Sequence, residues 1–171
     1  MSKHLQIFYG KAGSGKTYQC HKFLKENPDY TFLPHDNFKS LNDQIDLLQR
    51  SFTFYMFETT NKSVILKELM KNYDIAVVYA QFFISLYTAV VCRRIRDYTP
   101  DNFLLEIPYI DRSIDTMINF AESLGYKVSL VYVDEKEDVI KERLQARGWT
   151  EDRIKLTNYL WDYFYTRTDF V

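Results

Sequence analysis

The feature that most constrains the fold of this chain is the segment Gly10-Lys11-Ala12-Gly13-Ser14-Gly15-Lys16-Thr17, which satisfies the spacing G-x-x-x-x-G-K-[ST] in full. A short apolar run, Leu5 to Tyr9, comes directly before it, and a segment of helical character, Lys16 to Leu24, follows. The sequence therefore predicts a buried strand, a glycine-rich turn and a helix, which is the context that a phosphate-binding loop requires.

Each part of this loop has a chemical role toward a polyphosphate. Because Gly10, Gly13 and Gly15 carry no side chains, backbone N–H groups can approach the anion closely. The helix that follows directs its first N–H groups and its dipole at the same point. We expect Lys16 to place its charge between the β- and γ-phosphates, and the Thr17 hydroxyl to complete a Mg²⁺ shell. The loop from Gly10 to Thr17 is thus predicted to bind a nucleoside triphosphate with magnesium.

Strand-like and helical segments alternate along the rest of the chain. Short apolar runs predict further strands at 30–33, 103–106 and 128–133. Helical spacing of apolar residues follows Ser40, recurs from 114 to 124, and lies between Asp134 and Gly148, while Thr150 is expected to cap a last helix. This alternation predicts an α/β fold with three layers, α/β/α, around a parallel sheet. Without a linker, residues 1–171 are expected to form a single domain.

The region 51–97 is apolar and is predicted to be mostly helical, on the substrate side of the site. Within it, the stretch from Ile75 to Cys92 has no charged residue and approaches the length of a membrane span. Polar residues interrupt the stretch, namely Gln81, Ser85 and Thr88. A buried core helix or a homodimer interface through 75–92 is therefore favoured, and no membrane association is predicted.

Charge and cysteine usage narrow the class of protein further. The formal net charge is -1, which argues against a surface built as a whole to bind nucleic acid. Cys20 and Cys92 match no metal-ligand spacing, and both are expected to be buried thiols in a reducing compartment. The start of the chain, Met1 to His4, runs straight into a strand-like segment and leaves no room for a signal peptide. We therefore expect a cytoplasmic protein.

Candidate substrate residues follow the second and third predicted strands, at the carboxyl ends of the strands, where open α/β folds bind ligands. Asp36 could accept or orient the proton of an acceptor hydroxyl, or could only form an Asx turn. Glu106 could hold a water on Mg²⁺ or contact the acceptor, with a solvent-facing edge glutamate as the alternative. Arg112 could clamp substrate, while Asp111 or Ser113 next to it is expected to cap a helix.

Three arginines near the end of the chain predict a flap over the phosphates. Arg143 and Arg147 are four positions apart and share one helix face, and Arg153 follows shortly after Gly148. Such a flap would neutralise charge that develops during phosphoryl transfer, and we favour Arg147 for this role. The alternative is exposed arginines paired with nearby carboxylates. A further basic group, Arg93 to Arg96, is expected to be a solvated helix end.

With these residues in view, the chain resembles the P-loop kinase superfamily in three separate segments. The segment His35-Asp36-Asn37-Phe38 is similar to the one after the second strand of uridine kinase-like enzymes. The passage from Asn119 to Val128 resembles zeta-toxin-like and polynucleotide-kinase-like proteins. The stretch from Arg143 to Gly148 looks like the lid of deoxynucleoside kinases, although Trp149-Thr150 stands where those enzymes usually carry a second lid arginine.

This resemblance implies ATP as donor, Mg²⁺ as cofactor, and Lys16 and Arg147 at the transferred phosphoryl. It also implies Asp36 or Glu106 near the acceptor, with Phe38 beside them. A lid at 143–153 and a five-stranded parallel sheet would follow, with Thr168 to Val171 as a short fifth strand.

Three functional readings remain open from the sequence. The leading one is an ATP-dependent phosphotransferase acting on a nucleoside or nucleotide. A second is a zeta-toxin-like or other metabolite kinase with a sugar-type acceptor. The third is a nucleotide-binding regulatory module that docks a protein partner through 75–92.

Overall fold

The computed structural model describes residues 2–33, 62–98, 100–107 and 113–165, and the structural statements below concern those residues. Several predicted features lie outside them. These are the helix expected after Ser40, the fifth strand expected from Thr168 to Val171, and three candidate site residues, Asp36, Phe38 and Arg112.

Four parallel strands form the sheet of the described chain. They are β1 (Lys3–Tyr9), β2 (Thr31–Leu33), β3 (Asn102–Ile107) and β4 (Tyr126–Tyr132), and their order across the sheet is β2-β3-β1-β4. In β1, Ile7 pairs with Leu105 of β3 on one side and with Leu130 of β4 on the other. The parallel sheet was predicted correctly, and within the described residues it has four strands where five were expected.

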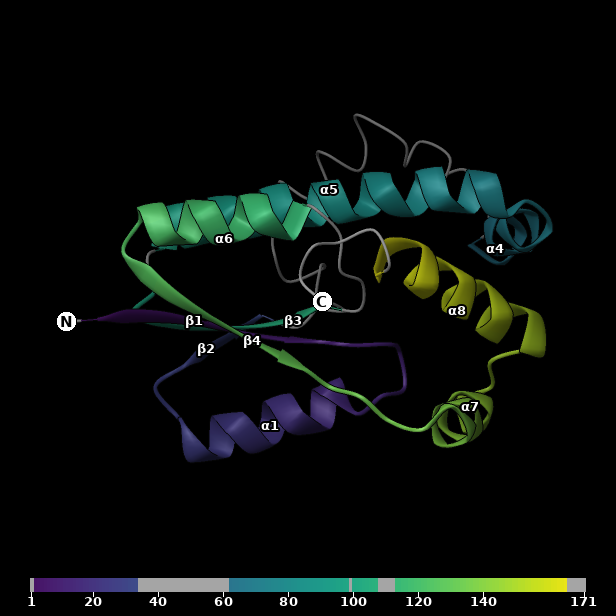
Figure 1. Cartoon of the computed structure of the whole chain (residues 1–171), viewed down its shortest axis with the longest axis horizontal. Coiled ribbons are helices and arrows are strands. Elements are labelled where there is room, and N and C mark those ends of the chain that lie inside the picture. Colours follow the sequence, from purple (N-terminus) through teal and green to yellow (C-terminus); the bar gives the residue numbers. More distant parts are fainter. Residues whose placement is uncertain (1, 34–61, 99, 108–112, 166–171) are drawn as a thin grey trace.

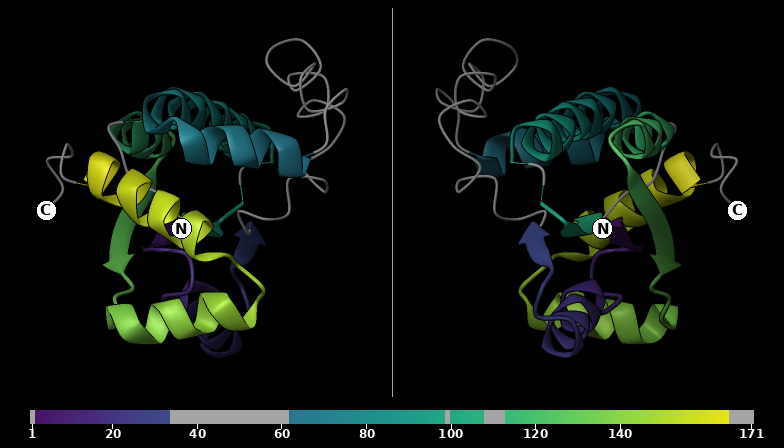
Figure 2. Two further views of the ribbon diagram at one scale, coloured as in Figure 1. Left: turned by 90° about the vertical axis from the view of Figure 1, so that its right-hand side faces the viewer. Right: turned by 90° about the vertical axis from the view of Figure 1, so that its left-hand side faces the viewer.

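Helices cover both faces of this sheet. They are α1 (Lys16–Glu26), α4 (Lys62–Lys71), α5 (Tyr73–Tyr98), α6 (Ser113–Ser123), α7 (Glu137–Ala146) and α8 (Glu151–Tyr165). Figure 1 shows α5 and α6 over one face and α1 over the other, and the two side views in Figure 2 agree. The three-layer α/β/α architecture is therefore confirmed.

The alternation of side chains along the strands decides which face each residue serves. In β3, Phe103, Leu105 and Ile107 belong to the core beneath α5 and α6. Leu104 points to the opposite face, where it packs in the cluster that contains Cys20 of α1. Since successive side chains of a strand point to opposite faces, Glu106 lies on the α1 side of the sheet. This alternation places Glu106 on the face where the helix of the glycine-rich loop begins.

The uncharged stretch 75–92 lies inside α5 and packs within the chain. Near its start, Ala76, Val77 and Ala80 pack in a cluster with residues of α8. Further along, Tyr87 and Val91 pack in the core over the sheet. Among the described helices, none has the length and apolar content needed to cross a membrane. The prediction of a buried core helix is thus confirmed, and the structure lends no support to the homodimer predicted through the same stretch.

Candidate active site

The glycine-rich loop joins β1 to α1 and requires glycine at the three predicted positions. Gly13 and Gly15 have φ angles of 82° and 99°, in the left-handed region that side chains disfavour. A Cβ on Gly10 would lie 2.4 Å from the carbonyl oxygen of Val133, just after β4. The loop therefore follows a tight path that leaves its backbone bare toward the start of α1.

Lys16 and Ser14 present polar groups inside this loop. The Lys16 side chain is buried, and its Nζ donates to the carbonyl oxygen of Lys11 at 2.8 Å. Ser14 is buried too, and its Oγ is a buried side-chain polar atom of the described residues that has no hydrogen-bond partner. Buried polar groups are normally hydrogen-bonded. The Lys16 ammonium inside the loop and the buried Ser14 hydroxyl without a partner among the described residues therefore fit a loop that binds an oxyanion.

Thr17 and Glu106 connect this loop to the end of β3. The Thr17 hydroxyl donates to Oε1 of Glu106 at 2.7 Å, and Glu106 is buried. A hydroxyl oxygen and a carboxylate oxygen this close together match the hard oxygen ligands that Mg²⁺ prefers. Because Glu106 is buried, the solvent-facing alternative is wrong, and Thr17 and Glu106 are residues that could hold a metal ion.

The junction of α7 and α8 forms the opposite wall of a cleft of about 670 Å³. Besides the loop itself, the cleft is lined by Tyr18, Gln19, Glu106, Val133, Asp134, Glu135, Arg143, Arg147, Trp149 and Arg153. Arg143 reaches furthest onto the loop, since its Nη1 donates to the carbonyl oxygen of Gly13 at 3.1 Å. Four basic side chains therefore line the cavity next to the glycine-rich loop: Lys16, Arg143, Arg147 and Arg153.

Comparison with protein families identifies the family of this chain. A family model described as AAA domain (AAA_33) matches residues 5–167, which is nearly the whole chain. The chain belongs to this AAA domain family. The predicted membership of the P-loop kinase superfamily is thereby confirmed at the level of family and fold. None of the curated proteins compared by sequence matches the chain.

Solved structures resemble this AAA domain in fold. A chain of the Pnkp1/Rnl/Hen1 RNA repair complex is 16% identical with a TM-score of 0.54, and the match covers 99% of this chain and 47% of that one. The AAA domain thus spans less than half of that chain. A sugar kinase from Janibacter sp. HTCC2649 is 17% identical, with coverages of 94% and 78% and a TM-score of 0.47. Deoxyadenosine kinase from M. mycoides with bound dATP is 13% identical, with coverages of 96% and 84% and a TM-score of 0.45.

Trp149 lines the cleft of the AAA domain, although the sequence analysis named it only as the residue that stands in place of a second lid arginine. The Arg153 guanidinium lies over its ring, 3.8 Å from the ring centroid, as a cation–π pair. The ring also packs against the small cluster of Ile140, Leu144 and Ile154 that joins α7 to α8. The sequence signal that could have predicted this pair is a Trp followed four positions later by an Arg, on either side of the start of a predicted helix.

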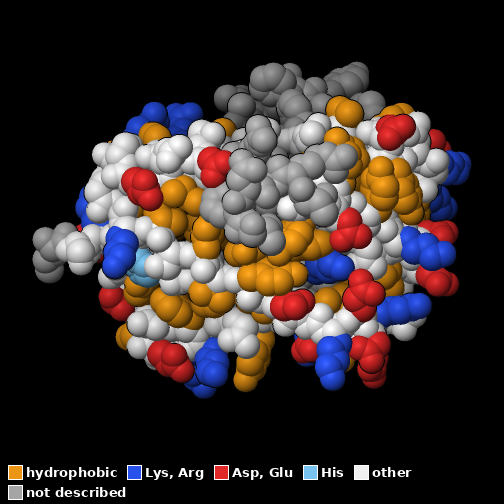
Figure 3. All heavy atoms as spheres, in the orientation of Figure 1, with side chains coloured by type: hydrophobic (Ala, Val, Ile, Leu, Met, Phe, Trp, Pro, Cys, Tyr) orange, Lys and Arg blue, Asp and Glu red, His pale blue; other side chains and the backbone are white. Residues whose placement is uncertain are grey.

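The three predicted arginines all line the cleft. Arg143 also donates to the loop backbone at Gly13, whereas the sequence favoured Arg147 for the role at the transferred phosphoryl, which stays a prediction. Arg147 caps the end of α7 and lines the same cleft. At the far end of the molecule, Arg93 and Arg96 pair with Asp97 on the exposed end of α5, as expected for a solvated helix end. On the face in Figure 3, acidic and basic side chains are mixed over the α7 region instead of gathering by sign.

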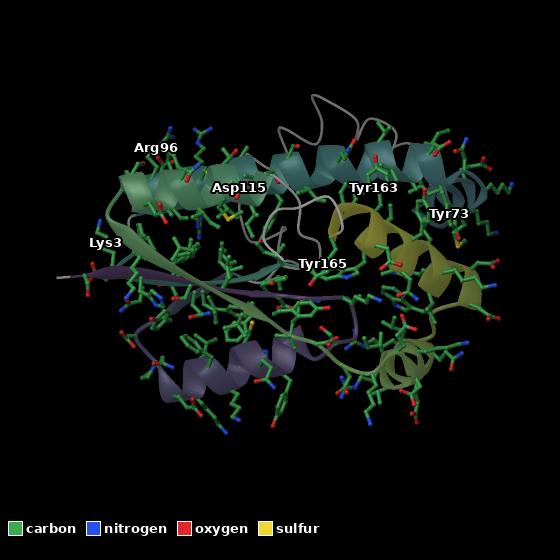
Figure 4. The ribbon with its side chains drawn as sticks, viewed as in Figure 1. Lys3, Tyr73, Arg96, Asp115, Tyr163 and Tyr165 are labelled. Atoms are coloured by element: carbon green, nitrogen blue, oxygen red, sulfur yellow. The ribbon has the colours of Figure 1, made fainter. Side chains whose placement is uncertain are left out.

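Stacked aromatic rings attach α8 to the carboxyl end of the sheet. The Tyr132 ring stacks on Trp161 and Tyr165, with ring centroids 5.9 and 5.7 Å apart, and also contacts Tyr9 at 5.2 Å. Figure 4 shows Tyr165 beside this end of the sheet, away from Lys3 at the amino end of β1. This stack holds the second half of α8 against the sheet.

Cys20 lies beneath the site and is not a nucleophile. Burial raises the pKa of its thiol to about 12, and the nearby Glu106 carboxylate adds to the effect. Because the thiolate is the reactive form, this cysteine stays inert near neutral pH. The prediction of a buried structural thiol is therefore confirmed for Cys20.

Proposed function

We propose that this AAA domain is an ATP- and Mg²⁺-dependent phosphotransferase that moves the γ-phosphoryl of ATP to a small acceptor, in the first place a nucleoside or nucleotide. The main support is the 2.7 Å contact between Thr17 and Glu106 beside the glycine-rich loop, with basic side chains of the α7–α8 junction across the cleft. Oxygen ligands on one side and guanidinium groups on the other suit a transferring phosphoryl group.

In this proposal the loop, the metal ligands and the arginines of the lid have different tasks. Backbone N–H groups of the loop and the Lys16 ammonium bind the phosphates. Thr17 and Glu106 would hold Mg²⁺, which would offset the negative charge of the phosphates. Arg143 and Arg147 neutralise charge that develops on the moving group, and Lys16 assists them. The region 143–153 acts as the lid.

The acceptor side of the proposal rests on residues outside the described part of the chain. Asp36 would orient or deprotonate the acceptor hydroxyl, Phe38 would stack against the base of the acceptor, and Arg112 would clamp the acceptor. The reducing compartment expected for Cys20 and Cys92 makes the cytoplasm the proposed site of action.

A phosphoryl-transfer screen tests the proposal and separates its alternatives. Wild-type protein with γ-labelled ATP and Mg²⁺ would be offered nucleosides, nucleotides, nucleotide sugars and pantetheine derivatives. A 5′-hydroxyl oligoribonucleotide joins the panel because one structural neighbour comes from an RNA repair complex. Labelled nucleosides or nucleotides support the leading proposal, and labelled sugar-type acceptors support a metabolite kinase.

Lys16→Ala is the matched control for this screen. It removes the buried ammonium of the loop and is expected to abolish both ATP binding and transfer. Transfer that survives in Lys16→Ala would contradict the proposal. ATP binding without transfer to any acceptor, together with nucleotide-dependent binding of a protein partner, would favour the regulatory module instead.

A further inference from the structure

Arg143 is held at the cleft by two anchors from different segments. Its Nη1 donates to the carbonyl oxygen of Gly13 in the glycine-rich loop at 3.1 Å. Its Nη2 donates to Oε2 of Glu135, in the short connection between β4 and α7, at 3.3 Å. Three parts of the chain therefore meet at one guanidinium group: the loop, the connection after β4, and helix α7.

The guanidinium lies directly over the site where an anion would bind. A Cβ added to Gly15, the residue before α1, would be 3.5 Å from Arg143 Nη1. The start of a helix with bare N–H groups attracts anions, so this cation stands next to the strongest anion-binding point of the loop. A guanidinium carries five N–H donors and the two anchors use one on each terminal nitrogen, which leaves donors for a phosphate.

We propose that Glu135 is a positioning residue that holds Arg143 across the glycine-rich loop in the orientation that meets the triphosphate. Both side chains are partly exposed, with 42% and 32% of their side-chain surface accessible, so the ion pair by itself stabilises the fold little. The ion pair instead fixes the orientation of the guanidinium. With the contact to Gly13 alone the guanidinium could rotate, and the second contact, to Glu135, fixes its plane.

Because Glu135 is negatively charged, the change in ATP affinity on neutralising it has opposite signs for a positioning role and for a pure charge effect. Glu135 lines the phosphate cleft, and a carboxylate there repels a triphosphate. If Glu135 acted only through its charge, neutralising it would strengthen ATP binding. If it positions Arg143, the same substitution weakens binding, because the single carbonyl oxygen of glutamine cannot accept from both the Lys136 backbone N–H and Arg143, as the two carboxylate oxygens do.

The first experiment compares Glu135→Gln with Asp134→Asn by calorimetry, using Mg²⁺ and a non-hydrolysable ATP analogue. Asp134 is the adjacent cleft carboxylate. Its Oδ1 accepts a hydrogen bond from the backbone N–H of Glu135 at 2.9 Å, and the side-chain oxygen of asparagine can accept the same bond. Glu135→Gln is expected to weaken the affinity about threefold or more. Asp134→Asn, which reports the charge effect alone, is expected to leave it equal or tighter.

A double-mutant cycle then shows whether Glu135 acts through Arg143. In the Arg143→Ala background, Glu135→Gln should cause no further loss of affinity, because the group to be positioned is gone. Equal losses in both backgrounds, or tighter binding by Glu135→Gln in the wild-type background, would overturn the proposal.

This inference rests on the nucleotide site of the proposed function. A measurement on the nucleotide-free protein tests the role of Glu135 separately from that function. In ¹H–¹⁵N spectra of the nucleotide-free protein, the side-chain N–H signals of Arg143 are expected to move toward free-arginine values in Glu135→Gln and to stay in place in Asp134→Asn. Unchanged signals in Glu135→Gln would refute the positioning role. If the wild type bound no nucleotide, the proposed function would fail while the spectra still decided the role of Glu135.

Discussion

Thr17 and Glu106 are separated by 89 positions in the sequence, and the folded sheet brings their side-chain oxygens within 2.7 Å. Glu106 reaches the site only because the alternation along β3 turns it toward α1. Its backbone carbonyl also accepts a hydrogen bond from the Tyr87 hydroxyl of α5 at 3.3 Å. A single residue at the end of β3 therefore contacts helices on both faces of the sheet.

This pair gives the first prediction at the residue scale. Thr17→Val and Glu106→Gln are each expected to lower the affinity for ATP in the presence of Mg²⁺ and to change it little without the metal, because both remove a metal ligand. The double variant should lose less than the sum of the two, since the residues act on one ion. Titration with an ATP analogue at several Mg²⁺ concentrations measures this. Equal losses with and without Mg²⁺ would contradict a metal site.

A second prediction concerns Gly13. Gly13→Ala forces a left-handed φ on alanine, about 1–2 kcal/mol, and places a Cβ 3.1 Å from Leu144 of α7. Gly125→Ala is the matched control, because Gly125 has a φ of 92° and nothing within 4 Å of an added Cβ. Urea unfolding should show a larger loss of stability for Gly13→Ala, and only that variant should lose ATP affinity. Equal losses would show that the contact with Leu144 is harmless.

A third prediction concerns pH and His4, which bonds to the Tyr30 hydroxyl and, at 2.8 Å, to Ser129 Oγ. Burial, and next the charge of Lys127, lower the pKa of His4 below its ordinary value of 6.5. The unfolded chain therefore takes up a proton first as the pH falls below about 6.5, and stability decreases. Urea unfolding at pH 7.5 and 5.5 should show a smaller decrease for His4→Gln than for the wild type. An unchanged pH dependence would contradict this role for His4.

At the scale of elements, the sequence was informative wherever the signal was local. The strand, loop and helix from β1 to α1 were predicted because glycine spacing and apolar runs act over a few residues. The bounds of α5 were not, since α5 is apolar on the several sides that meet the sheet, α4 and α8, and such a helix shows no clear period. Glu135 was not predicted because its role depends on a distant contact. Arg143, which pairs with Glu135, also donates to the carbonyl oxygen of Gly13, and these two residues are 130 positions apart in the sequence.

Helix α8 carries the prediction at this scale. Thr150 Oγ1 accepts a hydrogen bond from the backbone N–H of Arg153 at 3.2 Å, which is the predicted cap. Thr150→Ala is expected to reduce the free energy of unfolding by about 0.5–2 kcal/mol, whereas Thr150→Ser keeps the hydroxyl and most of the stability. Urea denaturation compares the two. A loss in the serine variant equal to that in alanine would show that the hydroxyl is not what matters.

At the scale of the whole molecule, ligand binding should appear as stability. A nucleotide that binds only the folded state stabilises it by about 2.7 kcal/mol at one hundred times its Kd. For a domain of this size, the midpoint of thermal unfolding should rise by about 5–10 °C with ATP and Mg²⁺. Lys16→Ala should show no rise. An equal rise in both proteins would place the nucleotide away from the loop.

The order of strands has a consequence for how the chain is made. In the sheet, Leu5 of β1 sits between Phe103 of β3 and Val128 of β4. During synthesis at about 5–20 residues per second, the apolar β1 segment leaves the ribosome and waits roughly 5–20 s before either neighbour exists. As an inner strand of the described sheet, β1 cannot complete its pairing until both neighbours have been made, so the glycine-rich loop attached to it cannot reach its final position against Val133 before then.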